Sequence, residues 1–126
     1  MARVVHFEIH AQSPERAIAF YAAVFGWSFT HLPQLDYWMI ATGEGAGIDG
    51  GLMRRQGPPP SEGQAVNAYV CTLAVDDLDD AMKAGVAAGG SVALPRMPIH
   101  SVGYVGYLKD TEGNIFGLHQ ADPNAK

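Results

Sequence analysis

An internal repeat limits most strongly what this chain of 126 residues can fold into. Similar residues recur in its two halves, with an offset of 64 residues early in each half and 66 later. The aligned pairs include Ser13 with Asp77, Gly26 with Gly90, Trp38 with Tyr104, Gly51 with Gly117, and Leu52 with Leu118. The two-residue change falls between elements, where loop length varies at little cost. Because one half alone would leave a sheet face unburied, we expect the halves to pack together.

The first half predicts a strand, a helix and three further strands. The segment VVHFEIH alternates, so Val5, Phe7 and Ile9 point one way while His6, Glu8 and His10 point the other. A serine then caps a helix that has proline in its first turn and ends before a glycine. Strands are expected over residues 27–30, 37–41 and 48–54, separated by turns rich in Pro or Gly.

The second half predicts the same order of elements after a linker rich in Pro and Gly. The expected elements are a strand at 69–75, a helix at 77–88, and strands near 91–94, 103–108 and 114–120. The sequence therefore predicts an α+β fold in which two tandem βαβββ modules form a curled mixed sheet, or cup, with the helices outside. We expect one domain over 1–126, with module 1 at about 3–54, a linker at about 55–66 and module 2 at about 67–121.

Composition and charge narrow the class of protein. The formal charge is −5 and the eight basic residues form no cluster, which argues against nucleic acid or an anionic membrane as partner. No apolar run approaches the ~18 residues of a membrane helix, and no signal-peptide pattern follows Met1. The single cysteine, Cys71, has apolar neighbours typical of a packed residue. A cytoplasmic protein is the expectation.

Several motifs resemble one known superfamily over nearly the whole chain. They are HFEI, SPERAIAFYAAVFGW, YVCTLAVDDLDDAM, AAGG and DTEGNIFGLHQ. These segments resemble a branch of the vicinal oxygen chelate superfamily, which includes glyoxalases, bleomycin-resistance proteins and extradiol dioxygenases. The resemblance implies paired βαβββ modules, often completed by a homodimer. It implies either an enzyme whose divalent metal stabilises an enolate or oxyanion, or a metal-free protein that sequesters a drug.

The metal positions implied by the resemblance have mostly lost their ligands. They correspond to His6, Gly51, Val70 and Gly117, of which only the histidine can bind a metal. A stable site needs about three or four ligands. We therefore expect no essential metal. The alternative is a displaced site for Zn, Ni or Fe(II), formed by His6, Glu8 and His119.

Strand parity predicts which side chains face the cup and bind the ligand. Glycines at the implied ligand positions would open room for a bulky or flat molecule, or else mark a bulge. Aromatic residues would add stacking surface, but a one-residue slip exchanges faces, so Tyr37 against Trp38 and Tyr104 against Tyr107 stay open. The predicted substrate-binding residues are His10, Trp38, Gly51, Met53, Val70, Thr72, Tyr104, Gly117 and His119.

These observations favour a homodimer that binds a small organic molecule in the cup. If the protein is an enzyme, we expect lyase or isomerase chemistry related to that of lactoylglutathione lyase, with His6 and Glu8 as the acid/base pair. One alternative is a metal-dependent glyoxalase-like lyase that uses the displaced ligands. Another is a resistance protein that sequesters an antibiotic without turnover.

Overall fold

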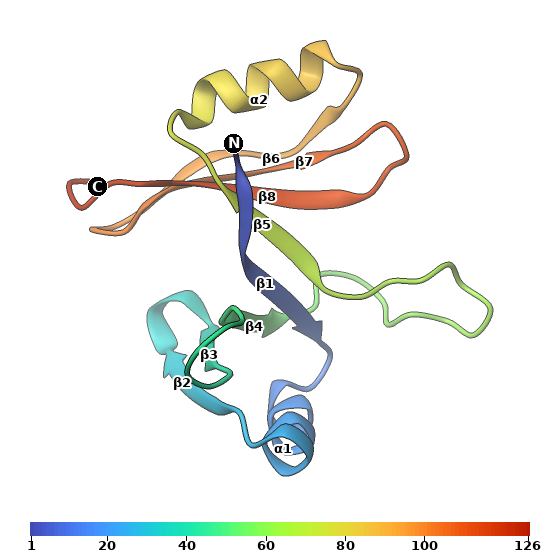
Figure 1. The fold of residues 1–126 in the computed structure, drawn as a ribbon. Helices are drawn as coiled ribbons and strands as arrows, with labels where there is room; N and C mark the ends of the chain where they lie inside the picture. Colours follow the sequence, from blue (N-terminus) through green and yellow to red (C-terminus); the bar gives the residue numbers. More distant parts are fainter. The chain divides into compact units, whose positions relative to one another are not determined.

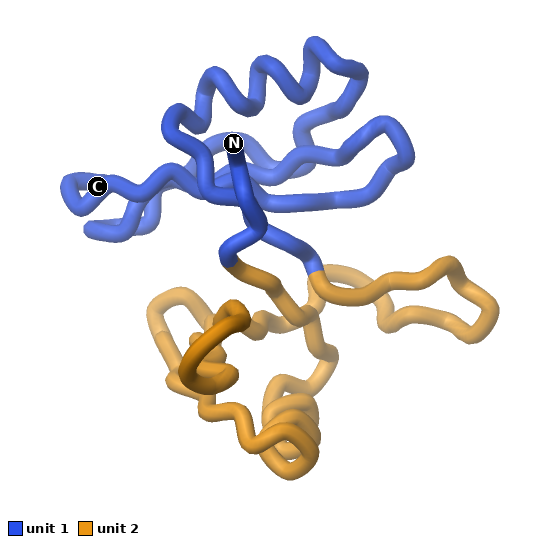
Figure 2. Tube along the Cα trace, viewed as in Figure 1, with its two compact units in different colours: residues 1–5, 70–126 blue, residues 6–69 orange.

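The computed structural model describes residues 1–126, which form two compact units. The first unit consists of residues 1–5 and 70–126, and the second of residues 6–69 (Figure 2). The second unit therefore takes in both the predicted linker and nearly all of predicted module 1. Each unit is described by itself below.

The predicted order of elements is present twice along the chain (Figure 1). The first set is β1 (Arg3–Ala11), α1 (Pro14–Phe25), β2 (Ser28–Leu32), β3 (Tyr37–Ala41) and β4 (Gly50–Arg54), with a short 3-10 helix at Pro33–Leu35. The second set is β5 (Val70–Ala74), α2 (Leu78–Ala87), β6 (Ser91–Ile99), β7 (Gly103–Lys109) and β8 (Ile115–Ala121). The α+β class is confirmed. Strand β6 is longer than predicted because it continues past Pro95 and Pro98, and prolines are tolerated on an edge strand.

Strand pairing follows one scheme in both sets. In the first set, β1 runs parallel to β4, and β4, β3 and β2 follow as antiparallel neighbours. In the second set, β5 runs parallel to β8, and β8, β7 and β6 follow in the same way. Glu8 lies opposite Gly51 in the first set, and Thr72 lies opposite Gly117 in the second. This shared register supports the internal duplication.

The register corrects one pair of the predicted repeat. Trp38 lies opposite Leu52, whereas the residue opposite Leu118 is Gly106 rather than Tyr104. The offset between β3 and β7 is therefore two residues larger than that between β4 and β8. The physical reason is the hairpin loop, which spans residues 42–49 in the first set and 110–114 in the second.

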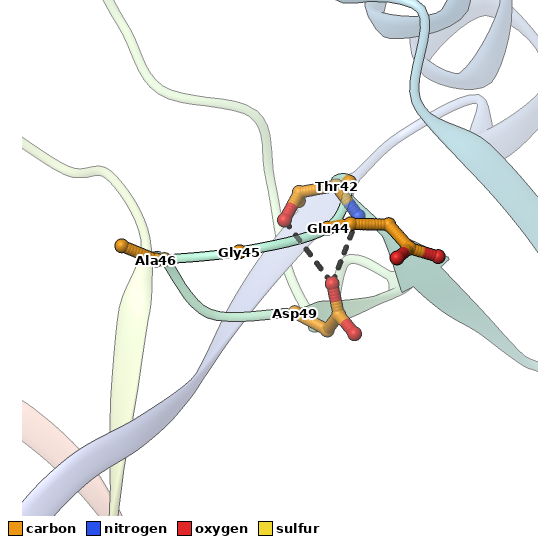
Figure 3. A pocket seen from close by; sticks show the side chains of 7 residues that line it. Thr42, Glu44, Gly45, Ala46 and Asp49 are labelled. Carbon is orange, nitrogen blue, oxygen red and sulfur yellow. Dashed lines mark hydrogen bonds between the residues drawn. The ribbon is translucent and has the colours of Figure 1, made fainter.

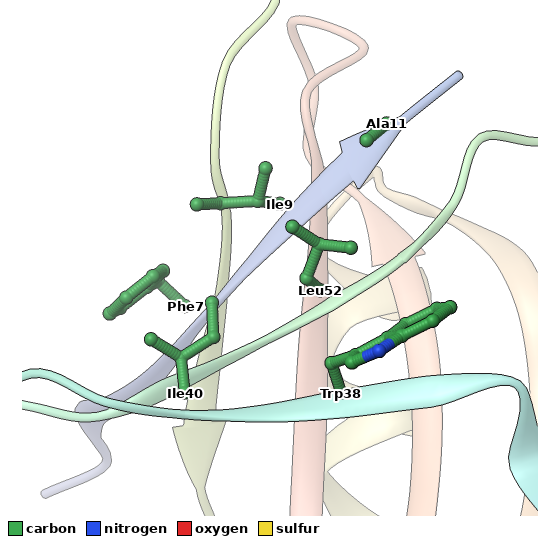
Figure 4. Packing of buried hydrophobic residues seen from close by; sticks show 6 residues of the cluster. All are labelled: Phe7, Ile9, Ala11, Trp38, Ile40 and Leu52. Carbon is green, nitrogen blue, oxygen red and sulfur yellow. The ribbon is translucent and has the colours of Figure 1, made fainter. Parts of the chain in front are cut away.

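Each helix packs against the strands of its own set. In the second unit, Ala17, Ile18 and Tyr21 of α1 pack against a buried core. Its side chains are those of Phe7, Ile9, Ala11, Trp38, Ile40 and Leu52 (Figure 4). In the first unit, Leu78 of α2 packs with Leu108 and Leu118. Neither helix is long and apolar enough to cross a membrane.

Candidate functional site

Strand β1 presents its polar residues on the face opposite α1. Phe7 and Ile9 lie in the core, so His6, Glu8 and His10 project from the other side, as the alternation predicts. Glu8 is nevertheless only 5% exposed. We call this side of the second unit's sheet the polar face.

A hydrogen-bond network joins four side chains on the polar face; we call it the Glu8 network. The Tyr37 hydroxyl donates to Glu8 Oε2 at 3.1 Å, and His6 Nε2 lies 2.9 Å from the same hydroxyl oxygen. A hydroxyl has one hydrogen, so in this arrangement His6 Nε2–H is the donor to Tyr37. On the other side of the carboxylate, His10 Nε2 lies 3.1 Å from Glu8 Oε1. Each carboxylate oxygen of Glu8 thus has its own polar partner on this face.

The open choice between Tyr37 and Trp38 is decided by packing. Trp38 is 8% exposed and lies in the core with Leu52, its partner in register. Its side chain therefore points away from the polar face, whereas the sequence placed Trp38 among the ligand-binding residues. Tyr37 lies on the polar face instead, opposite Met53 in register, which decides the choice that the sequence left open.

Gly51 is explained by the same tyrosine. A side-chain carbon added at Gly51 would overlap the hydroxyl and ring of Tyr37. The glycine therefore leaves room for a residue of this chain, where the sequence predicted room for a ligand. Gly117 is less crowded, because a carbon added there would lie 3.0 Å from Thr72 Oγ1 and 3.1 Å from the ring of Tyr107.

The first unit carries the remaining predicted site residues. Leu118 packs under α2, so Gly117 and His119 lie on the opposite face of the sheet, as strand parity predicts. On β5, Val70 and Thr72 are both buried. Tyr104 differs from the prediction: it packs against the core under α2, with the Arg96 guanidinium 4.1 Å from its ring centre.

His119 has an unusual environment within the first unit. Its Nε2 atom is buried without a hydrogen-bond partner, and a side chain added at Gly103 would meet this atom at 2.8 Å. Burial of the imidazole lowers the pKa of His119 below its ordinary value, because desolvation disfavours the charged form.

The residues present do not fit the metal site that the superfamily implies. Gly51, Val70 and Gly117 have no donor side chain, and the Tyr37 hydroxyl engages both His6 and Glu8. Neither unit contains a group of three or more His, Cys, Asp or Glu side chains placed to hold a metal ion.

A small pocket, separate from the polar face, lies in the hairpin loop at residues 42–49 and is formed by the loop itself. Asp49 Oδ1 accepts hydrogen bonds from the Thr42 backbone N–H at 2.9 Å and from the Thr42 hydroxyl at 3.1 Å (Figure 3). The Thr42 hydroxyl also lies 2.8 Å from the Ile48 carbonyl oxygen. These contacts close the loop on itself, so Asp49 is a loop-forming residue.

Comparison with known proteins gives one family match and several relatives. Residues 3–43 match the family described as bleomycin resistance protein-like N-terminal. Two curated proteins, from Mycobacterium bovis and Mycobacterium tuberculosis, are 27% identical over 118 residues and are described as a candidate glyoxylase, CFP32. The alignment covers 91% of this chain and 44% of each relative, so the chain spans less than half their length.

Solved structures share the fold at low sequence identity. Methylmalonyl-CoA epimerase from Mycobacterium tuberculosis aligns with a TM-score of 0.65 at 16% identity, covering 95% of this chain and 88% of that one. A glyoxalase/bleomycin resistance protein/dioxygenase superfamily member from Vibrio splendidus aligns with a TM-score of 0.65 at 15% identity, covering 97% and 100%. Residues 3–43 are thus similar to the bleomycin resistance protein-like N-terminal family, and the chain as a whole shares its fold with these two solved structures.

Proposed function

We propose that the protein binds a small organic molecule on the polar face and acts on it as a lyase or isomerase, without an essential divalent metal. The observation that carries the proposal is the Glu8 network, in which one buried carboxylate orients a tyrosine that also meets a histidine. The relatives named as a glyoxylase and an epimerase support this class of chemistry. Both kinds of reaction move protons at a carbon next to a carbonyl.

Each member of the network has a definite role in this proposal. His6 and Glu8 form the acid/base pair, and the Tyr37 hydroxyl links them through two short hydrogen bonds. A proton can then pass between the two groups without exchange with bulk water. Positioned acid/base groups of this kind contribute roughly 10²–10⁴-fold to a rate.

The substitution Tyr37→Phe tests the proposal. It removes the hydroxyl and uncouples His6 from Glu8, so the ring ¹⁵N signals of His6 should shift, and turnover of a substrate found by panel screening should fall about 10²-fold or more. Tyr69→Phe is the matched control, because the Tyr69 hydroxyl is bonded to Tyr21 at 3.0 Å, away from the network. Unchanged His6 signals and unchanged turnover in the Tyr37 variant would contradict the proposal.

Two alternatives have their own signatures. If the protein is a metal-dependent enzyme, elemental analysis of protein purified without chelators should find near-stoichiometric Zn, Ni or Fe. The His6→Ala variant should lose this metal. That result would overturn the metal-free proposal. The antibiotic-binding reading is favoured by the N-terminal family match. It predicts tight binding of a cationic or aromatic antibiotic without turnover, and weaker binding in the Glu8→Gln variant.

We also propose that the functional form is a homodimer of the 13.4 kDa chain. The superfamily resemblance supports this assembly. Light scattering after size-exclusion chromatography measures the mass directly, and a monomer at working concentration contradicts it.

A further inference from the structure

Arg55 is fixed in place at the end of the polar face. Its backbone N–H donates to the Ala11 carbonyl oxygen at 2.9 Å, so the chain continues the β1–β4 ladder for one residue beyond β4. Its guanidinium Nη2 donates to the His10 carbonyl oxygen, also at 2.9 Å. The sequence predicted only a linker at this position.

The guanidinium lies on the same side of the sheet as the Glu8 network. Leu52 lies in the core, and alternation then places Met53 and Arg55 on the polar face and Arg54 on the other. The bond to the His10 carbonyl brings the guanidinium to the residue whose imidazole contacts Glu8. That imidazole is 29% exposed, so this end of the network is open to solvent.

Arg55 is the arginine of the chain with a buried guanidinium nitrogen that has no hydrogen-bond acceptor. Arg54 pairs with Asp36 at 3.1 Å and Arg96 with Asp79 at 2.7 Å, both near the surface. By contrast, Arg55 Nε is buried and has no hydrogen-bond acceptor. An unsatisfied buried donor on a charged group is costly, and a planar guanidinium matches a carboxylate with two parallel hydrogen bonds.

We infer that Arg55 is the residue that recognises an anionic group of the ligand, and that the substrate is a small organic carboxylate. This inference rests on the proposed function, because it concerns the same polar face. The carboxylate binds the guanidinium beside His10, and the reacting part of the molecule lies toward Tyr37 and His6. Arg55 thus selects the substrate class, whereas the Glu8 network carries the proton chemistry.

The test compares small carboxylic acids with their primary amides, which have nearly the same shape but no charge. Pyruvate with pyruvamide and benzoate with benzamide serve as probes, titrated into the protein while the ring signals of His6 and His10 are followed by NMR. The wild type should bind the acids at least about 10-fold more tightly than the amides, as expected for a charge-assisted hydrogen bond.

Three variants assign this preference to one residue. Arg55→Gln should remove the preference for acids over amides. Arg55→Lys should keep part of this preference, because the charge remains without the planar guanidinium, and Arg54→Gln should keep it fully. If Arg55→Gln does not fold, the preference of the wild type for acids over amides, and its partial loss in Arg55→Lys, still test the inference. Equal binding of acid and amide, or a preference that survives Arg55→Gln, overturns the inference while binding itself still supports the proposed function. If neither member of any pair binds, both the inference and the proposed function fail.

Discussion

Tyr37 and Gly51 act as one unit at the scale of single residues. The tyrosine reaches His6 and Glu8 because residue 51 has no side chain in the way. Any side chain at residue 51 would overlap the space that the Tyr37 phenol fills.

Gly51→Ala should destabilise the fold by about 1–3 kcal/mol, because the added methyl group forces the Tyr37 ring to move. It should also reproduce the effect of Tyr37→Phe on the His6 signals. Chemical denaturation measures the first effect and NMR the second. Gly117→Ala is the matched control in the other half of the repeat and should cost less. In a Tyr37→Ala background the loss of stability caused by Gly51→Ala should be much smaller. An unchanged loss would show that the two residues are not coupled.

His119 should make stability depend on pH. Its folded-state pKa is lowered by burial, so below the ordinary value of about 6.5 the unfolded chain binds more protons than the folded one. The contribution is fully present above that value and is lost as pH falls through the lower folded-state pKa. Denaturation between pH 8 and pH 5 should show a flatter profile for His119→Gln, whereas His100→Gln on an exposed turn should follow the wild type. Identical profiles for His119→Gln and wild type would contradict this account.

At the scale of elements, both helices begin as the sequence predicts. Ser13 Oγ accepts from the Arg16 backbone N–H at 3.3 Å, and Asp77 Oδ1 accepts from that of Asp80 at 3.0 Å. Gly26 ends α1 with a φ of 72°, a left-handed conformation that glycine adopts without strain. These features were predictable because capping depends on neighbours within a few residues along the chain.

The start of α2 also has a partner that no local pattern reveals. The Gln120 side chain accepts a hydrogen bond from the Leu78 backbone N–H at 2.8 Å, from a strand 42 residues away. Asp77→Ala should therefore cost only about 1 kcal/mol, since the glutamine still satisfies one N–H of the first turn. Thermal unfolding checks this, with Asp76→Ala as control. A loss above about 2 kcal/mol would mean that Gln120 provides no second cap.

At the scale of the whole molecule, the duplication gives each unit its own helix and its own core. The two copies are not chemically equal. The polar face of the second unit holds the Glu8 network, whereas the corresponding positions of β5 hold Val70 and Thr72. The two copies therefore share a packing pattern but differ in the polar side chains that their first strands carry.

If the chain is one domain, as the repeat predicts, it should unfold in one cooperative step. Leu52→Ala and Leu108→Ala each empty a fully buried position in a different unit, which costs about 2–5 kcal/mol. Either variant should shift a single unfolding transition, and far-UV circular dichroism and tryptophan fluorescence should report the same midpoint. Because both tryptophans lie in the second unit, fluorescence reports on that unit alone. Two separate transitions, with fluorescence responding only to Leu52→Ala, would establish two domains.

The sequence alone determined the order of elements, the helix caps, the duplicated topology and the parity of β1 and β8. These features follow from local chemistry and from periods of two and 3.6 residues. Tertiary structure alone decided that Tyr37 rather than Trp38 lies on the polar face, that Tyr104 lies under α2, and that Arg55 reaches His10. The reason is strand register: a hairpin loop of unknown length sets it, and a shift of one residue moves a side chain to the other face.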